Sequence, residues 1–185
     1  MENLNIALIG CGMIGREHIE RIQNRIRNAK VVAVCDVFEE GAKKGAEIAG
    51  AGTKVYTDFN EAINDPDVNA VVVTTPGQFH KGPVLAAIKA GKPVFSEKPL
   101  ANTAADGKEI VEAEMAGGKH LVQVGFMRRY DRGYRQVKEL IDSGKFGAPM
   151  VIKCTHRADG VADDYTTAMA VTDTCLLYTS PSPRD

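Results

Sequence analysis

The sequence lacks the features that would place the chain in a membrane, on a nucleic acid or around a metal ion. None of its apolar stretches approaches the roughly 20 residues that a membrane-spanning helix needs. Its 23 basic and 24 acidic residues nearly cancel and form no long basic block, which argues against nucleic-acid or polybasic membrane binding. Cys11, Cys35, Cys154 and Cys175 have no metal-ligand spacing, and residues 2–5 show no signal-peptide pattern. We therefore expect a cytoplasmic protein with reduced thiols and no metal.

The sequence does contain a regular alternation of short apolar runs and helical patterns. The strand-like runs lie at residues 4–9, 31–35, 54–56, 69–74, 93–96 and 120–124. The helical patterns lie at residues 14–26, 39–49, 58–63, 84–90, 102–115 and 130–141. Continuous apolar strands separated by helices predict an α/β fold, a doubly wound parallel Rossmann sheet covered on both faces. We place this domain at residues 1–124, and residues 150–156 predict the first strand of a second domain.

Residues 10–15, GCGMIG, match the fingerprint G-x-G-x-x-G between the first strand and the first helix. Gly10 permits a tight turn, Gly12 lets the backbone approach a pyrophosphate, and Gly15 lets the helix pack closely on the strand. The start of the helix, at Met13 and Ile14, offers backbone N–H donors to the phosphates. The alternative is a glycine-rich turn in an α/β domain that binds no nucleotide.

Asp36 lies 21 residues after Gly15, at the end of the second predicted strand. A carboxylate at that place can bond to the ribose 2′-hydroxyl, and it repels the 2′-phosphate of NADP. The next two residues, Val37 and Phe38, include no arginine that could hold a phosphate. The sequence therefore favours NAD as the cofactor. The alternative role for Asp36 is that of a helix N-cap.

Thr74, Thr75 and Pro76 end the strongest predicted strand, and His80 follows them. Pro76 forces the chain out of the sheet, since it has no N–H for a strand ladder. We expect these residues to face the cofactor crevice. His80 has a second interpretation, as a residue at the start of a helix with no chemical role.

Lys98 follows the next strand and precedes Pro99, which holds its backbone extended. Beside a nicotinamide, its ammonium can stabilise a developing alkoxide or relay a proton. The alternative is a surface lysine next to a turn. Residues 125–131, GFMRRYD, are dense in charge and aromatic rings at another strand exit. We expect Arg129 and Asp131 in that segment to form a salt-bridged helix start.

These motifs together resemble the Gfo/Idh/MocA oxidoreductase family: the glycine fingerprint, Thr74-Thr75-Pro76 with a later histidine, and Glu97-Lys98-Pro99. Residues 15–19, 121–131 and 164–174 are similar to bacterial inositol 2-dehydrogenases within that family, and the likeness extends over residues 1–174. The resemblance implies an NAD-dependent oxidation of myo-inositol at one ring hydroxyl. It also implies an α+β second domain with a mostly antiparallel sheet, begun by residues 125–174, and a homotetramer.

The resemblance also assigns roles to individual residues. Lys98 and Asp173 are implied to be catalytic, and both also to contact the substrate. Glu97 and Lys98 are implied to lie at the cofactor, while Met127, Arg128 and His156 belong to the substrate pocket. Asp173 pairs in the family with a catalytic histidine four residues later, on the same helix face. This sequence has Leu177 at that position.

Residues 175–185, CLLYTSPSPRD, depart from the family pattern. One back-translation of them reads as a transposase-type sequencing adaptor translated in frame, so we hypothesise that the natural gene continues and that this segment is not native. The alternative is a natural Ser/Pro tail. The tail interpretation predicts that this chain is an inactive fragment of a longer enzyme. Two other functions remain open: a dehydrogenase of another polyol or sugar, such as scyllo-inositol or glucose, and a non-catalytic NAD-binding regulator.

Overall fold

The computed structural model describes residues 3–151 and 153, which contain one six-stranded sheet with helices on both faces. The strands are β1 (Leu4–Ile9), β2 (Ala29–Cys35), β3 (Lys54–Tyr56), β4 (Ala70–Val73), β5 (Val94–Ser96) and β6 (Val122–Val124). The main helices are α1 (Met13–Arg25), α2 (Glu39–Ala49), α3 (Phe59–Asn64), α4 (Lys81–Lys89), α5 (Ala104–Ala116) and α6 (Arg132–Asp142). All five strand pairings are parallel in the order β3-β2-β1-β4-β5-β6, which confirms the predicted Rossmann topology.

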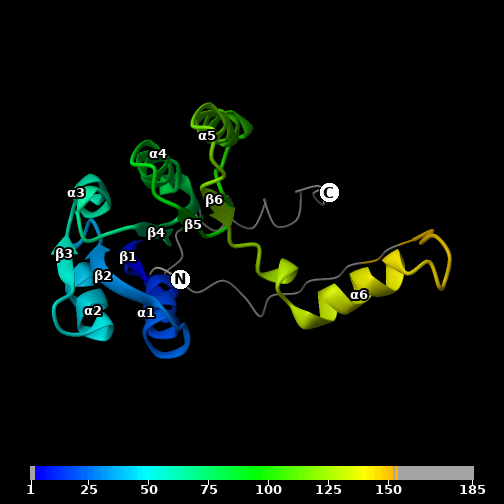
Figure 1. Cartoon of the computed structure of the whole chain (residues 1–185), viewed down its shortest axis with the longest axis horizontal. Helices are drawn as coiled ribbons and strands as arrows, with labels where there is room; N and C mark the ends of the chain where they lie inside the picture. Colours follow the sequence, from blue (N-terminus) through cyan, green and yellow to red (C-terminus); the bar gives the residue numbers. More distant parts are fainter. Residues whose placement is uncertain (1–2, 152, 154–185) are drawn as a thin grey trace, which may run out of the picture.

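The core consists of two apolar layers, one on each face of the sheet. Successive residues of a strand point to opposite faces, so Ile6 and Leu8 belong to one layer and Ala7 and Ile9 to the other. Figure 1 shows α1 and α2 over the first face and α3, α4 and α5 over the second. Because both faces are covered, the central strands are apolar throughout, as all four residues of β4 are.

Side-chain caps explain where α3, α5 and α6 begin. Asp58 caps α3 by accepting the N–H of Asn60 at 2.7 Å, and Thr103 caps α5 in the same way. The predicted helix at residues 84–90 begins earlier, at Lys81. The periodic apolar pattern missed this start because Pro83 stands in the first turn, where a helix tolerates a residue without an N–H.

The carboxyl ends of the central strands lie level with one another. Ile9 is opposite both Cys35 and Val73, and Ser96 is opposite both Val73 and Val124. The residues that follow these strands continue the ladder: Gly10, Thr74, Glu97 and Gly125 each donate an N–H to the last carbonyl of the neighbouring strand, at 2.8–2.9 Å. This register places the residues after β1, β2, β4, β5 and β6 side by side along one edge.

The chain after β6 leaves the sheet through a 3₁₀ turn, η2 (Met127–Arg129), into α6. Asp131 caps α6 by accepting the N–H groups of Gly133 and Tyr134, so the helix starts slightly later than predicted. In Figure 1 α6 extends away from the sheet, and it has no buried residue. Within the described residues, no helix is long and apolar enough to cross a bilayer. The boundary at residue 124 stays a prediction, because most of the predicted strand at 150–156 lies outside the described residues.

Candidate active site at the carboxyl edge of the sheet

The glycine fingerprint forms the turn between β1 and α1, and its glycines meet different surroundings. Gly10 has a φ of +98°, and a Cβ there would lie 2.7 Å from the backbone nitrogen of Thr75. A Cβ on Gly15 would lie 2.0 Å from the carbonyl oxygen of Gly10. A Cβ on Gly12 would meet no atom of the protein within 4 Å. Gly10 and Gly15 are therefore enclosed by their own chain, and Gly12 faces open space.

The N-terminus of α1 opens onto that same space. Gly12 is its N-cap residue, no side chain caps the helix, and its first turn has no acidic residue. The side chains of Met13 and Ile14 are 70% and 41% exposed. Free backbone N–H groups and the positive end of the helix dipole suit an anionic group. The geometry therefore fits a pyrophosphate beside Gly12.

The segment after β4 supports the glycine turn. The hydroxyl of Thr74 is buried and donates to the carbonyl oxygen of Gly10 at 2.6 Å. Thr75 is half-buried and Pro76 is exposed, so these two lie nearer the open edge. His80 departs from the prediction that it faces the crevice. Its side chain is fully buried, and each ring nitrogen has a backbone carbonyl as its partner inside the protein.

Asp36 lies at the end of β2, beside the glycine turn. One carboxylate oxygen accepts the N–H of Cys11 at 2.8 Å and the other accepts the N–H of Phe38 at 3.0 Å. Phe38, and not Asp36, is the N-cap residue of α2, so the alternative of a helix cap is wrong. Burial, with the negative charge of Asp36 nearby, raises the pKa of the Cys11 thiol to about 12. Cys11 therefore stays a neutral packing residue in the turn.

Glu97 and Lys98 follow β5 on the other side of β4. Both side chains are half-buried, and the Lys98–Pro99 peptide bond is cis. Burial acts to raise the pKa of Glu97, but hydrogen bonds from His18 and from the N–H of Lys98 bring it below its ordinary value. Glu97 is therefore a carboxylate at neutral pH. Sequence reasoning gave His18 no role, although a histidine on the apolar face of a helix is a signal that it has a buried partner.

Met127 and Arg128 lie in η2, just beyond β6 at the same edge. Both are more than half exposed. Arg128 forms an ion pair with Asp131 at 3.5 Å, and its guanidinium lies 5.1 Å from the ring centre of Tyr134. The salt-bridged helix start was predicted for Arg129 and Asp131, and the structure shows Arg128 paired with Asp131. His156 and Asp173 lie outside the described residues.

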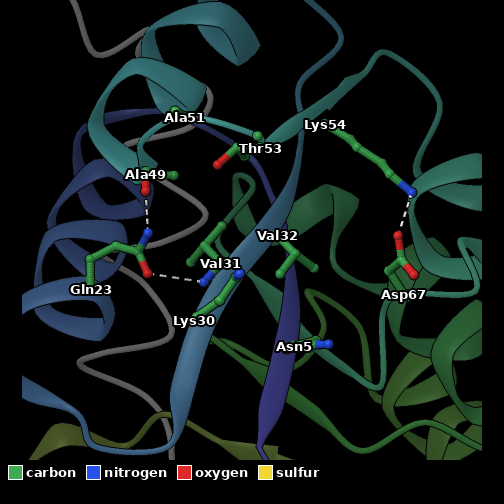
Figure 2. Close-up of a pocket in the computed structure, with 11 residues that line it drawn as sticks. Asn5, Gln23, Lys30, Val31, Val32, Ala49, Ala51, Thr53, Lys54 and Asp67 are labelled. Carbon is green, nitrogen blue, oxygen red and sulfur yellow. Dashed lines mark hydrogen bonds and ion pairs between the residues drawn. The ribbon is translucent and has the colours of Figure 1, made fainter.

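A hollow of about 440 Å³ lies at the opposite, amino-terminal edge of the sheet (Figure 2). Several of its polar groups already have partners. Gln23 donates to the carbonyl of Ala49 and accepts the N–H of Val31, and Lys54 pairs with Asp67 at 2.8 Å. Ligands of open α/β sheets bind at the carboxyl ends of the strands, so the candidate site is at the glycine turn and not here. No three His, Cys, Asp or Glu side chains of the described part of the chain gather as a metal site.

Comparison with protein families shows to which family the chain belongs. Residues 4–126 match the model of the Gfo/Idh/MocA oxidoreductase family, NAD-binding Rossmann fold. The match covers more than half of the chain, so the protein belongs to this family of NAD-binding oxidoreductases. This finding confirms the family, the fold class and the cofactor that the sequence predicted.

The most similar relatives narrow the comparison to inositol dehydrogenases. The inositol 2-dehydrogenases of Azotobacter vinelandii and Burkholderia cenocepacia are 54% and 50% identical over 173 residues, which is 94% of this chain and 51% of theirs. The solved myo-inositol dehydrogenase of Lactobacillus casei, in complex with NAD(H) and myo-inositol, is 42% identical, with a TM-score of 0.86 over 92% of this chain and 50% of its own. A scyllo-inositol dehydrogenase from the same organism is 31% identical, with a TM-score of 0.73 over 79% of this chain. The chain spans about half the length of these relatives.

Proposed function

We propose that this chain is the cofactor-binding part of an NAD-dependent inositol 2-dehydrogenase, which oxidises myo-inositol to the 2-keto product. The observation that carries the proposal is the shared edge: the open glycine turn, Asp36 and Lys98 follow β1, β2 and β5, whose ends lie level. The identity to inositol 2-dehydrogenases over residues of both the edge and the following segment supports the substrate class.

The residues of the edge fit NAD. Gly12 and the uncapped start of α1, with Met13 and Ile14, would hold the pyrophosphate. Asp36 would accept a hydrogen bond from the adenosine ribose, because its two backbone bonds fix the carboxylate at the end of β2. Thr75 and Pro76 would form the wall of the crevice beside β4. The buried side chains of Thr74 and His80 would hold the loops behind that wall. When bound, NAD supplies the acceptor for the substrate hydride.

Lys98 has the position and the freedom that its proposed role requires. It is half-buried, its backbone is fixed by Glu97 on one side and Pro99 on the other, and its ammonium has no hydrogen bond or ion pair with any described residue. A positive charge in such a place can stabilise the alkoxide that forms as a hydroxyl loses its proton. Met127, Arg128, His156 and Asp173 are proposed to contact the polyol. Leu177 cannot take a proton, so this chain lacks the base expected beside Asp173.

We propose that the enzyme is a longer protein, a cytoplasmic homotetramer, and that the 185-residue chain is inactive. NADH production from myo-inositol plus NAD should be compared between this chain and a version continued past Thr174 from the source DNA. Activity in the longer protein alone is the expected result. Activity in the 185-residue chain would show that the missing histidine is dispensable. No NADH from either protein, with any polyol, would favour a regulator.

Lys98→Met in the longer protein tests the catalytic assignment. Removal of one stabilising charge from a reacting centre costs about a hundredfold or more in kcat. We expect this loss, with NADH binding kept within about twofold because methionine retains most of the length and volume of the lysine side chain without its charge. Lys89→Met is the matched control, an exposed lysine near the end of α4. Turnover in Lys98→Met equal to that of the control would remove the proposed role.

A second substrate has its own support, because a scyllo-inositol dehydrogenase shares this fold at 31% identity. Relative kcat/KM for myo-inositol, scyllo-inositol and glucose would decide between them. The myo isomer is the expected preference, given the 54% identity to an inositol 2-dehydrogenase.

A further inference from the structure

A histidine of the dinucleotide-binding helix bonds to the glutamate that directly precedes Lys98. His18 lies in the second turn of α1, and its Nε2 is 3.0 Å from Oε1 of Glu97. Both side chains are only 19% exposed. The imidazole also meets the ring of Phe95 edge-on, with the ring centres 5.7 Å apart. The histidine is therefore held against β5 by one polar and one aromatic contact, which fixes its orientation.

The chemistry of Glu97 determines the direction of this bond. Its pKa is below its ordinary value, so it is a carboxylate that only accepts hydrogen bonds. Nε2 of His18 therefore carries the hydrogen atom and is the donor of this hydrogen bond. The second carboxylate oxygen accepts the N–H of Lys98 at 3.2 Å. The carboxylate thus forms a bridge from the side chain of His18 to the backbone of Lys98.

A second histidine holds the other side of Lys98. Nδ1 of His80 lies 2.5 Å from the carbonyl oxygen of Pro99, and its Nε2 lies 2.6 Å from that of Thr75. His80 is fully buried, so this contact is protected from water. The backbone of Lys98 is thus fixed between α1 and the start of α4, while its ammonium remains unpaired among the described residues.

We propose that His18 is a positioning residue: through Glu97 it places Lys98 relative to the cofactor. The physical reason is that α1 is the element whose N-terminus faces the pyrophosphate site. A bond from α1 to the residue before Lys98 gives the cofactor and the ammonium one common rigid support. A displacement of about 1 Å at a reacting group can cost about a hundredfold in rate, so such a support has a measurable effect. This inference rests on the proposed dehydrogenase function for its effect on turnover, but not for its structural part.

The structural part is tested in the 185-residue chain by amide hydrogen exchange of Lys98. His18→Leu removes the donor, and His18→Gln offers an amide N–H in its place. Arg21→Gln is the matched control, because it breaks an exposed ion pair with Glu17 on the same helix. We expect exchange at Lys98 to rise about tenfold in His18→Leu, to return most of the way in His18→Gln, and to stay unchanged in Arg21→Gln. Equal exchange in all variants would overturn the proposal.

The catalytic part is tested by steady-state kinetics of the protein continued past Thr174. His18→Leu should lower kcat about tenfold or more, with the Kd for NADH within about twofold, and His18→Gln should recover most of the rate. Added to Glu97→Gln, the His18→Leu change should have no further effect, because both act through one bridge. Parallel losses of kcat, NADH binding and melting temperature would show a merely structural residue and overturn the proposal. If the wild-type protein oxidises no polyol, the proposed function fails, while the exchange experiment still decides the placement of Lys98.

Discussion

Alanine at each of two fingerprint glycines will separate cofactor binding from folding. A Cβ on Gly15 would lie 2.0 Å from the carbonyl oxygen of Gly10 and 2.9 Å from the hydroxyl of Thr74, so α1 must move away from the sheet. Alanine gains about 1 kcal/mol over glycine inside a helix, and overpacking costs about 1–3 kcal/mol. Because the clash is with backbone, we take the upper figure of about 3 kcal/mol and subtract the gain of about 1 kcal/mol. The free energy of unfolding of Gly15→Ala should therefore be about 2 kcal/mol lower than that of the wild type. A Cβ on Gly12 meets no atom of the protein, so we expect Gly12→Ala to change the free energy of unfolding by less than about 1 kcal/mol.

Gly12→Ala, which should change stability little, should weaken NADH binding strongly. Its added methyl group occupies the space that the pyrophosphate needs, so the affinity for NADH should fall at least about tenfold, or about 1.4 kcal/mol. Urea unfolding followed by circular dichroism gives the stability, and the fluorescence of NADH gives the affinity. The control is Gly107→Ala, since Gly107 lies in α5 and a Cβ there meets no atom within 4 Å. This variant should be more stable than the wild type and should bind NADH equally well.

Two outcomes would refute this reasoning. If Gly15→Ala is as stable as Gly107→Ala, then α1 does not lie against Gly10 as closely as described. If Gly12→Ala binds NADH as tightly as the wild type does, then the phosphates do not approach the backbone at Gly12. The second outcome would remove the fit on which the cofactor site rests.

Two further predictions concern carboxylates. Asp36→Asn keeps an acceptor for the N–H group of Cys11 or Phe38 but loses the charge that repels a 2′-phosphate. The ratio of the Kd for NADP to the Kd for NAD should therefore fall by about tenfold. Competition with NADH measures both constants. Burial acts to raise the pKa of Asp65, but its hydrogen bonds, of which that from Lys54 is the strongest, lower it from 3.8 to about 2. Its contribution to stability is therefore complete above pH 3.8 and is lost as the pH falls toward 2, so the difference in urea midpoint between wild type and Asp65→Asn should shrink over that range.

Much of the fold could be predicted because its strands are dense apolar runs with glycine or proline at their ends. The apolar run at residues 69–74 predicts a strand, and the structure has β4 there. The glycines at residues 10–15 predict a turn into a helix, and α1 begins there. The starts of α4 and α6 were less well predicted, since Pro83 and the turn η2 interrupt the apolar period on which the prediction rested.

The candidate site could be predicted only where its residues lie next to a strand end. The positions of Asp36 and Lys98, just after β2 and β5, were predicted in this way. The contact between His18 and Glu97 was missed because the two residues lie 79 positions apart in the sequence, and no local pattern joins them. The burial of His80 was missed for a related reason, since its two carbonyl partners come from the segments after β4 and β5. Such contacts exist only after the strands have taken their order in the sheet.

The order of the strands also sets when the cofactor site comes into existence during synthesis. The glycine turn leaves the ribosome early, but the hydroxyl that braces Gly10 belongs to Thr74, 64 residues later, and β1 has no neighbour on that side until β4 is made. Until β4 is made, the glycine turn lacks the hydroxyl that braces it. A ligand that binds the braced turn therefore stabilises the folded state in which β1 and β4 are paired.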